Sequence, residues 1–117
     1  MPKHHSINYV EFPSTDLTAT KEFYSSVFGW EFQDWGEEYV SFSGAEVEGG
    51  FAFGEIAKKP SRDGVLVVLY SNDLEASQAA IVAAGGTICM DTIEFPGGKR
   101  FQFLDPSGNE LGVWTEA

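Results

Sequence analysis

The stretch STDLTAT at residues 14–20 decides the fold, because it recurs as SNDLEAS at residues 71–77. The offset of 57 residues then holds without a gap onward to Gly29 and Gly86. Ser, Thr and Asp oxygens accept hydrogen bonds from the free N–H groups that begin a helix. A repeat at about half the chain length indicates two copies of one supersecondary unit. The space that two such units enclose is where we look for a site.

Hydrophobic periodicity predicts the same order of elements in both halves. In the first half we expect a strand at 7–12 ended by Pro13, a helix at 17–28 ended by Gly29, and strands at 30–35, 39–42 and 48–53. In the second half we expect a strand at 65–70, a helix from the Asp73 cap to about Ala84, and strands at 87–93, 99–104 and 110–115. The motif DPSGN at 105–109 is typical of a hairpin turn, with Gly and Asn in left-handed positions.

Each half is therefore β-α-β-β-β, and the expected class is α+β. We predict two tandem βαβββ modules that form a curved mixed sheet around a cavity, each with its helix on one face. The chain of 117 residues is expected to be a single domain, 1–117. Module one spans about 5–56, a polar linker about 57–64 and module two about 65–116.

The chain is strongly acidic, which narrows the classes of partner. Seven Lys and Arg stand against eighteen Asp and Glu, giving a net charge of −11 and a pI of about 4.3. Too few cations remain to follow a phosphate backbone or to bind an anionic membrane, so we expect neither nucleic acid nor a membrane as partner. The charge favours neutral or cationic ligands, although solubility alone would also explain it.

The single cysteine and the lengths of the apolar runs indicate the cellular compartment in which we expect the protein. The chain has one cysteine, Cys89, which excludes an intrachain disulfide and a thiolate metal cluster. Its apolar, strand-like surroundings predict a buried, inert thiol. No apolar run reaches membrane-spanning length and the start lacks an apolar signal segment, which predicts a cytoplasmic location.

The order and spacing of several motifs carry a resemblance to a known family. They are the two helix starts, FY at 23–24, FGW at 28–30, AGG at 84–86 and DPSGN at 105–109. In this order they resemble the vicinal oxygen chelate superfamily, which includes glyoxalase I, bleomycin resistance proteins, extradiol dioxygenases and fosfomycin resistance enzymes. The resemblance covers about residues 5–114. It implies the paired-module fold, a homodimer, and in the family's enzymes a divalent metal held by His, Gln or Glu side chains.

The metal-ligand positions that the resemblance implies hold unsuitable residues. The first ligand, seven residues before each helix-starting Asp, falls on Tyr9 and Leu66. The last ligand falls on Gly112, and Glu48 is the best candidate for its counterpart in module one. A neutral phenol is a poor ligand, and Leu and Gly offer none. We therefore predict no metal of the family's kind and no cofactor.

The two histidines offer no replacement for these ligands. His4 and His5 are adjacent near the start of the chain. Because neighbouring residues of a strand point to opposite faces, we expect them not to converge on one ion. A surface location is the alternative that we favour.

Strand alternation sorts the residues that face the cavity from those that face a helix. If Tyr9 faces the cavity, Glu11 does too, while Val10 and Phe12 meet the helix. The expected ligand-binding cavity is lined by Tyr9, Glu11, Trp35, Glu48, Phe51, Leu66, Gln102, Gly112 and Trp114. This mixture of aromatic and apolar groups with a few carboxylates is typical of a ligand pocket, although the aromatic residues could equally be plain core. No catalytic residue is identified.

Three functions remain open. The first is a metal-free small-molecule binding protein, resembling the bleomycin resistance branch, with a neutral or cationic, aromatic or apolar ligand. The second is a metal-dependent enzyme such as a glyoxalase-like lyase, an isomerase or a dioxygenase, which the missing ligands disfavour. The third is a structural or interaction protein whose cavity is filled by side chains. Ligand screening, metal-dependent turnover and the cavity volume distinguish the three.

Overall fold

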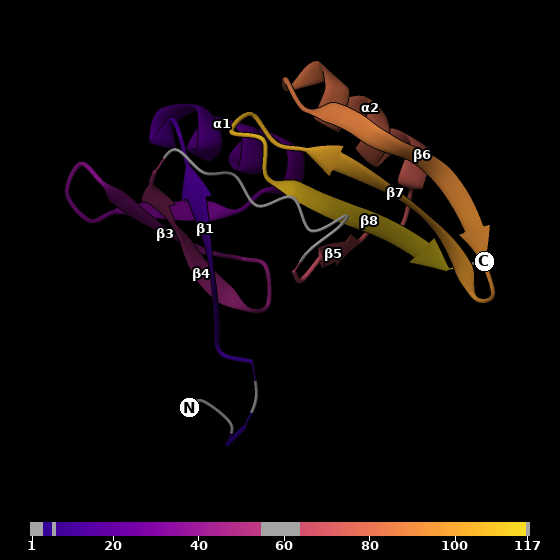
Figure 1. The fold of residues 1–117 in the computed structure, drawn as a ribbon, viewed down its shortest axis with the longest axis horizontal. Helices are drawn as coiled ribbons and strands as arrows, with labels where there is room; N and C mark the ends of the chain where they lie inside the picture. The colour runs from indigo at the N-terminus through magenta and orange to yellow at the C-terminus, as the bar shows by residue number, and fades with distance from the viewer. Residues whose placement is uncertain (1–3, 6, 55–63, 117) are drawn as a thin grey trace.

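The computed structural model describes residues 4–5, 7–54 and 64–116 (Figure 1). The first half contains β1 (Tyr9–Ser14), α1 (Leu17–Phe28), β2 (Glu31–Asp34), β3 (Tyr39–Ser43) and β4 (Glu48–Phe53). The second half contains β5 (Val67–Tyr70), α2 (Leu74–Ala83), β6 (Thr87–Phe95), β7 (Gly98–Leu104) and β8 (Glu110–Glu116). The α+β class and the two βαβββ modules are confirmed. Apart from Gly64, the predicted linker at 57–64 lies outside the described residues.

The modules form two four-stranded mixed sheets with the same topology. The strand orders are β1-β4-β3-β2 and β5-β8-β7-β6. In each sheet the first strand of the module pairs parallel with the last, and the other pairs are antiparallel. Both modules therefore follow one plan, as the sequence repeat predicts.

The repeated phrase is a helix cap in both modules. The Asp16 carboxylate accepts a hydrogen bond from the Ala19 N–H at 3.0 Å, and Asp73 accepts one from Ala76 at 3.1 Å. Such a cap satisfies one of the N–H groups that have no partner within the helix. Gly29 ends α1 in the left-handed region with φ of 73°. The predicted bounds of α1 are confirmed.

Pro13 does not end β1, which continues to Ser14 with Pro13 beside Ala52. This expectation was wrong because β1 lies at the edge of its sheet. A proline that lacks an N–H is tolerated on an edge strand.

The turn after β7 joins the two modules. Asp105 accepts hydrogen bonds from the backbone N–H groups of Ser107 at 2.9 Å and Asn109 at 2.8 Å. Gly108 adopts a left-handed φ of 93°, but Asn109 does not, so that part of the expectation is corrected. Instead, the Asn109 side-chain amide donates to the Pro13 carbonyl at 2.7 Å. The hairpin motif thus also ties module two to β1.

The core lies where α1 meets both modules. Phe23 and Phe28 each approach the Phe103 ring with centroids 6.1 Å apart, and the buried Tyr24 hydroxyl donates to Asp105 at 2.9 Å. Burial and the Asp105 carboxylate raise the pKa of Tyr24 well above its ordinary value. The two helices lie on the same side of the molecule, above the sheets in Figure 1, so among the described residues each sheet has one face that no helix covers. Within the described part of the chain, neither helix is long and apolar enough to span a membrane.

Candidate functional site

The first face, as we call it, is the surface of the N-terminal sheet that points away from α1. Alternation along β1 follows the prediction: Tyr9 and Glu11 are exposed, whereas Val10 and Phe12 pack into the core. Register places their neighbours, with Tyr9 beside Glu48 and Glu11 beside Gly50. The members of this face are Tyr9, Glu11, Glu31, Gln33, Trp35, Tyr39, Ser41, Ser43, Glu48 and Gly50.

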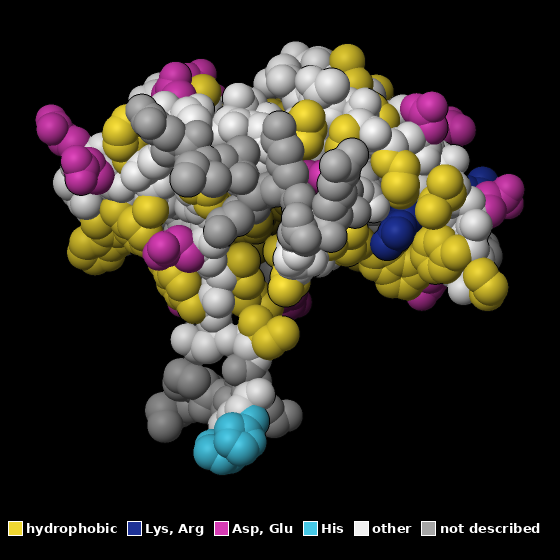
Figure 2. All heavy atoms as spheres, in the orientation of Figure 1, with side chains coloured by type: hydrophobic (Ala, Val, Ile, Leu, Met, Phe, Trp, Pro, Cys, Tyr) yellow, Lys and Arg dark blue, Asp and Glu magenta, His cyan; other side chains and the backbone are white. Residues whose placement is uncertain are grey.

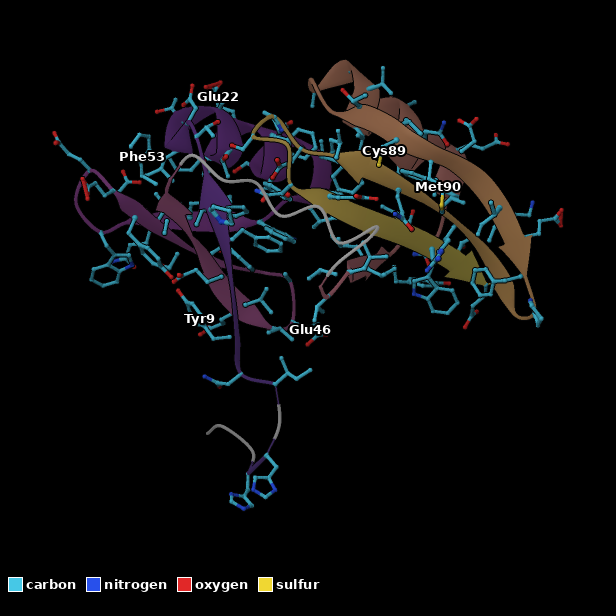
Figure 3. All side chains as sticks on the ribbon, in the orientation of Figure 1. Tyr9, Glu22, Glu46, Phe53, Cys89 and Met90 are labelled. Carbon is cyan, nitrogen blue, oxygen red and sulfur yellow. The ribbon has the colours of Figure 1, made fainter. Side chains whose placement is uncertain are left out.

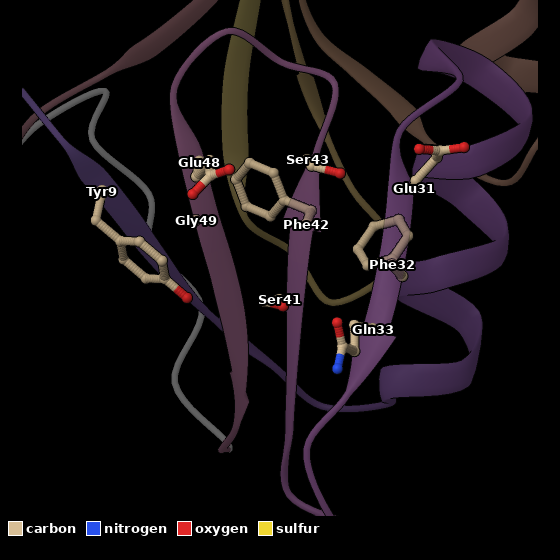
Figure 4. A pocket seen from close by; sticks show the side chains of 9 residues that line it. All are labelled: Tyr9, Glu31, Phe32, Gln33, Ser41, Phe42, Ser43, Glu48 and Gly49. Carbon is tan, nitrogen blue, oxygen red and sulfur yellow. The ribbon is translucent and has the colours of Figure 1, made fainter. Parts of the chain in front are cut away.

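A hollow of about 590 Å³ opens at this sheet. It is lined by Tyr9, Glu31, Phe32, Gln33, Ser41, Phe42, Ser43, Glu48 and Gly49. Tyr9 and Gln33 stand on opposite sides of the hollow with Ser41 between them (Figure 4). Two lining side chains are carboxylates and none is Lys or Arg, so the hollow is acidic. Its size is within the range of small-molecule pockets.

A cluster of two tyrosines and a glutamate lies beside the hollow. The hydroxyl oxygens of Tyr9 and Tyr39 are 2.6 Å apart, and Tyr39 is also hydrogen-bonded to the Glu11 carboxylate. Burial, the Tyr9 hydrogen bond and Glu11 raise the pKa of Tyr39 above its ordinary value, so this phenol stays protonated at neutral pH. A Cβ at Gly50 would meet both hydroxyl groups, so only glycine leaves room for the pair.

Sequence reasoning missed Tyr39, although a signal was available. Tyr39, Ser41 and Ser43 alternate with the buried Val40 and Phe42 along β3. That period of two places the three residues on one face. The predicted strand thus contained the information that Tyr39 faces the site.

Trp35 follows β2 at the margin of the first face and is 57% exposed. Its indole N–H donates to the Ser41 hydroxyl at 2.8 Å. The ring is therefore held next to a residue that lines the hollow, without lining it itself. Trp35 was predicted to line the cavity, whereas the structure places it at the margin of the hollow.

The assignment of Phe51 to the cavity was wrong. Phe51 has no exposed surface and packs in the core against Phe12 and Tyr24, with centroids 5.2 and 5.0 Å away. Glu48 and Phe51 are three residues apart on one strand, so alternation sends their side chains to opposite faces. Since Glu48 lines the hollow, Phe51 belongs to the core.

The second face is the surface of the C-terminal sheet that points away from α2. It carries Val68, Tyr70, Arg100, Gln102, Glu110, Gly112 and Trp114. Gln102 and Glu110 are buried, and the Gln102 amide donates to the Glu110 carboxylate at 2.5 Å. Trp114 contacts the Tyr70 and Phe95 rings with centroids 5.0 and 6.4 Å away. None of these residues lines the hollow on the first face.

The predicted cavity residues are therefore divided between two faces. Leu66, half-buried just before β5, belongs with the second face, as do Gln102, Gly112 and Trp114. Hydrophobic side chains gather beneath both sheets along the lower edge of the space-filling view (Figure 2). The structure thus brings Tyr9 and Glu48 together and leaves the second-module residues in a separate group.

Cys89 is exposed, so the expectation of a buried thiol was wrong. It lies on the second sheet, whereas Tyr9 lies beneath the first (Figure 3). A register shift in β6 between Ile88 and Met90 interrupts the regular alternation there. Partial burial and the nearby Glu110 carboxylate raise the pKa of Cys89 to about 11, so the group is a thiol at neutral pH.

Register corrects the pairing of Glu48 with Gly112 across the repeat. In module one Glu11 lies beside Gly50, and in module two Val68 lies beside Gly112. Glu11 and Val68 are equivalent in the 57-residue repeat, so Gly112 corresponds to Gly50. By the same register Glu48 corresponds to Glu110.

These positions bear on the metal that the resemblance implies. The four equivalent positions hold Tyr9, Gly50, Leu66 and Gly112, whose side chains supply one neutral phenol. In the ranges that the structure describes, no three His, Cys, Asp or Glu side chains gather closely enough to hold a metal ion. The donor set at these positions does not fit a divalent metal. Metal-free function stays a prediction for experiment.

His4 and His5 lie in a turn and not in a strand, so the geometric reason given for excluding them was wrong. His5 has a left-handed φ of 66°, and the two exposed rings stack with centroids 3.8 Å apart. Neither lines the hollow.

The fold and the sequence agree on the family. Residues 6–113 match the model of the Glyoxalase/Bleomycin resistance protein/Dioxygenase superfamily. The chain belongs to this superfamily, and the resemblance seen in its motifs is confirmed.

The individual proteins that match this chain share 30% of its residues or fewer. The chain is 30% identical over 118 residues to a Mycobacterium tuberculosis protein named "Putative glyoxylase CFP32", covering 92% of this chain. It spans 44% of the length of that relative. Among solved structures, a superfamily enzyme from Burkholderia phytofirmans PsJN has a TM-score of 0.78 at 18% identity, covering 96% of this chain and 99% of that one. A glyoxalase I mutant from Zea mays has a TM-score of 0.71 at 19% identity, covering 92% and 45%. At these identities the structures show a shared fold.

Proposed function

We propose that this chain binds a small organic molecule, neutral or cationic, in the hollow of the first face, without a metal. The observation that carries the proposal is the composition of this hollow. It combines the aromatic side chain of Tyr9 and the carboxylates of Glu31 and Glu48, with the exposed Trp35 indole at its margin. Aromatic walls with a few placed polar groups are typical of ligand sites.

The donor set separates this proposal from metal-dependent chemistry. A lyase or dioxygenase site of the family's kind requires several N or O ligands around one ion with a position left open for substrate. Tyr9, Leu66 and Gly112 do not supply them. The acidic lining disfavours anionic substrates for the same electrostatic reason that it favours cations. Our second candidate is therefore a metal-dependent enzyme such as a glyoxalase-like lyase, an activity in keeping with the name of the Mycobacterium relative.

A thermal-shift screen tests the proposal. Cationic aromatic and neutral aromatic compounds are added with and without a chelator. We expect at least one compound to raise the melting temperature by about 10 °C at about 100 times its Kd, with no effect of the chelator. Glu48→Lys should abolish that shift, whereas Glu94→Lys, an exposed site on β6, should not. Stabilisation by no compound, or only with added metal, would contradict the proposal.

We also propose a second copy of the chain as partner, giving a homodimer. Large hydrophobic side chains are exposed on both faces: Tyr9 and Trp35 on the first, Val68 and Tyr70 on the second. The first face carries Glu11 and Glu48, and the second carries Arg100, so the first face of one copy complements the second face of another. Light scattering should give twice the monomer mass of 12.8 kDa. A monomer would contradict the dimer and leave the ligand proposal standing.

A further inference from the structure

The hydrogen bonds among Glu11, Tyr39 and Tyr9 have a fixed direction. An ionised carboxylate only accepts hydrogen bonds, so the Tyr39 hydroxyl donates its single proton to Glu11. The Tyr39 oxygen must then accept from Tyr9, since the two oxygens are 2.6 Å apart and one of them has to donate. Burial is the largest cause of the raised pKa of Tyr39, and the hydrogen bonds to Tyr9 and Glu11 add to it.

This direction determines what Tyr9 offers to the hollow. Its proton is held by Tyr39, so the remaining capacity of the Tyr9 oxygen is that of an acceptor. Tyr9 is 44% exposed and lines the hollow, so this oxygen is accessible. Glu48 lies beside Tyr9 in register and also only accepts. Two neighbouring side chains thus present acceptors, and no Lys or Arg in the lining offsets them.

The aromatic rings at the hollow complete the chemistry of the ligand. The Tyr9 ring lines the hollow and is 44% exposed, and the Trp35 indole stands at the margin of the first face, 57% exposed. The Trp35 ring is held there by its hydrogen bond to the Ser41 hydroxyl at 2.8 Å. Exposed rings beside two acceptors suit a molecule with a flat or apolar body and one donor-bearing end.

We propose that the hollow selects molecules with a protonated primary or secondary amine on an aromatic or apolar body, whose N–H groups donate to the Tyr9 oxygen and the Glu48 carboxylate. Tyr39 and Glu11 are positioning residues, which set the direction of the Tyr9 hydroxyl without contacting the ligand. The inference rests on the proposed function and deepens it, because it names the ligand class of the same hollow. It also distinguishes amines that carry an N–H from quaternary amines of the same charge.

Calorimetric titration of the full chain with three probes tests the inference. The probes are phenethylammonium, its N-trimethylated form and phenethyl alcohol. Phenethylammonium should bind about tenfold more tightly than either of the others, because only it combines charge with N–H donors. This comparison needs no variant, so it does not depend on the folding of a mutant.

Substitutions assign the effect to Tyr9. Tyr9→Phe should weaken phenethylammonium by about tenfold and change the trimethylated probe by less than about twofold. Thr18→Val is the control, since it removes an exposed hydroxyl on α1, away from both open faces. It should leave all three affinities unchanged.

Tyr39→Phe tests the positioning role. With its acceptor removed, the Tyr9 hydroxyl becomes free to donate, so acetophenone, which only accepts, should bind more tightly while phenethylammonium binds more weakly. A purely structural effect would weaken both probes together. Equal losses, or equal binding of all probes to the unmodified chain, would overturn the inference and leave the proposed function standing. Binding of no probe would overturn both.

Discussion

The two sheets share a plan but differ in the chemistry of their open faces. Tyr39 and Arg100 occupy equivalent places, since Tyr39 lies beside Ala52 and Arg100 beside Trp114 in the corresponding strands. Glu11 on the first face is replaced by Val68 on the second. Positions that face a helix remain apolar in both modules, because they build one shared core. Strand residues that point away from the helices do not contribute to this core, so their chemistry can differ between the modules. We therefore place function on these open faces.

The modules also differ at the end of their third strands. Gly44 follows β3 and Asp105 follows β7. Only the second of these turns supplies a carboxylate that binds Tyr24 of the other module. This hydrogen bond between the modules therefore depends on the turn after β7, which has no counterpart in the turn after β3.

The largest expected effect comes from removing this link. Asp105→Ala leaves four donated hydrogen bonds without an acceptor, those from the Tyr24 hydroxyl, the Ser107 N–H and the Asn109 backbone and side-chain amides. Asp105 is only 4% exposed, so water replaces these bonds poorly. We expect the free energy of unfolding in urea to fall by about 3–5 kcal/mol.

Asp34→Ala is the control for this change. It removes a surface carboxylate whose partner is Lys21 at 2.8 Å, and exposed ion pairs of this kind are worth less than about 1 kcal/mol. A similar small loss for Asp105→Ala would show that the modules are held together elsewhere.

A smaller effect should separate the two equivalent glycines. A Cβ at Gly50 would lie within 2.7 Å of the Tyr9 oxygen and still closer to Tyr39, whereas at Gly112 the nearest atom is 3.4 Å away. Gly50→Ala should cost about 1–2 kcal/mol and part the two tyrosines, while Gly112→Ala should stay within about 0.5 kcal/mol. Thermal unfolding measures the first effect. Ultraviolet titration should show Tyr39 ionising at lower pH in Gly50→Ala, and equal behaviour of the two variants would remove the proposed difference between the faces.

The smallest effect concerns the equivalent carboxylates Glu48 and Glu110. Removing the Glu110 charge should lower the pKa of Cys89, which burial and this carboxylate hold at about 11. Glu110→Gln should therefore speed alkylation of Cys89 at pH 8 by a few fold, because the thiolate is the reactive form. Glu48→Gln, on the other face, should leave the rate unchanged. An unchanged alkylation rate in both variants would mean that burial alone raises the pKa of the Cys89 thiol.

The same thiol gives an alkaline pH dependence of stability. Its pKa in the folded chain lies above its ordinary value of 9.0, so its contribution to stability is complete below about pH 9. That contribution is lost as the pH rises from about 9 to 11. Cys89→Ser should flatten the dependence over this interval in urea unfolding measurements.

Much of the fold could be predicted because its signals are local. The bounds of α1 follow from the Asp16 cap and the left-handed Gly29, which lie beside the residues they affect. The errors arose where several strands had to be combined. Phe51 was placed in the cavity against the alternation from Glu48, and Glu48 was matched with Gly112 before the register was known. Of the residues on the first face that make up the candidate site, Tyr9, Glu11 and Glu48 were predicted, but Tyr39 was missed.

By itself the sequence determined the two modules, their helix caps and the superfamily, because caps, turns and periodic strands are read from neighbouring residues. It also placed Tyr9, Leu66 and Gly112 at the positions where the resemblance implies metal ligands. Only the tertiary structure decided that Tyr9 meets Tyr39, 30 residues away, across an intervening glycine. Such contacts depend on strand register and on which sheet face is left open, which are properties of the assembled chain.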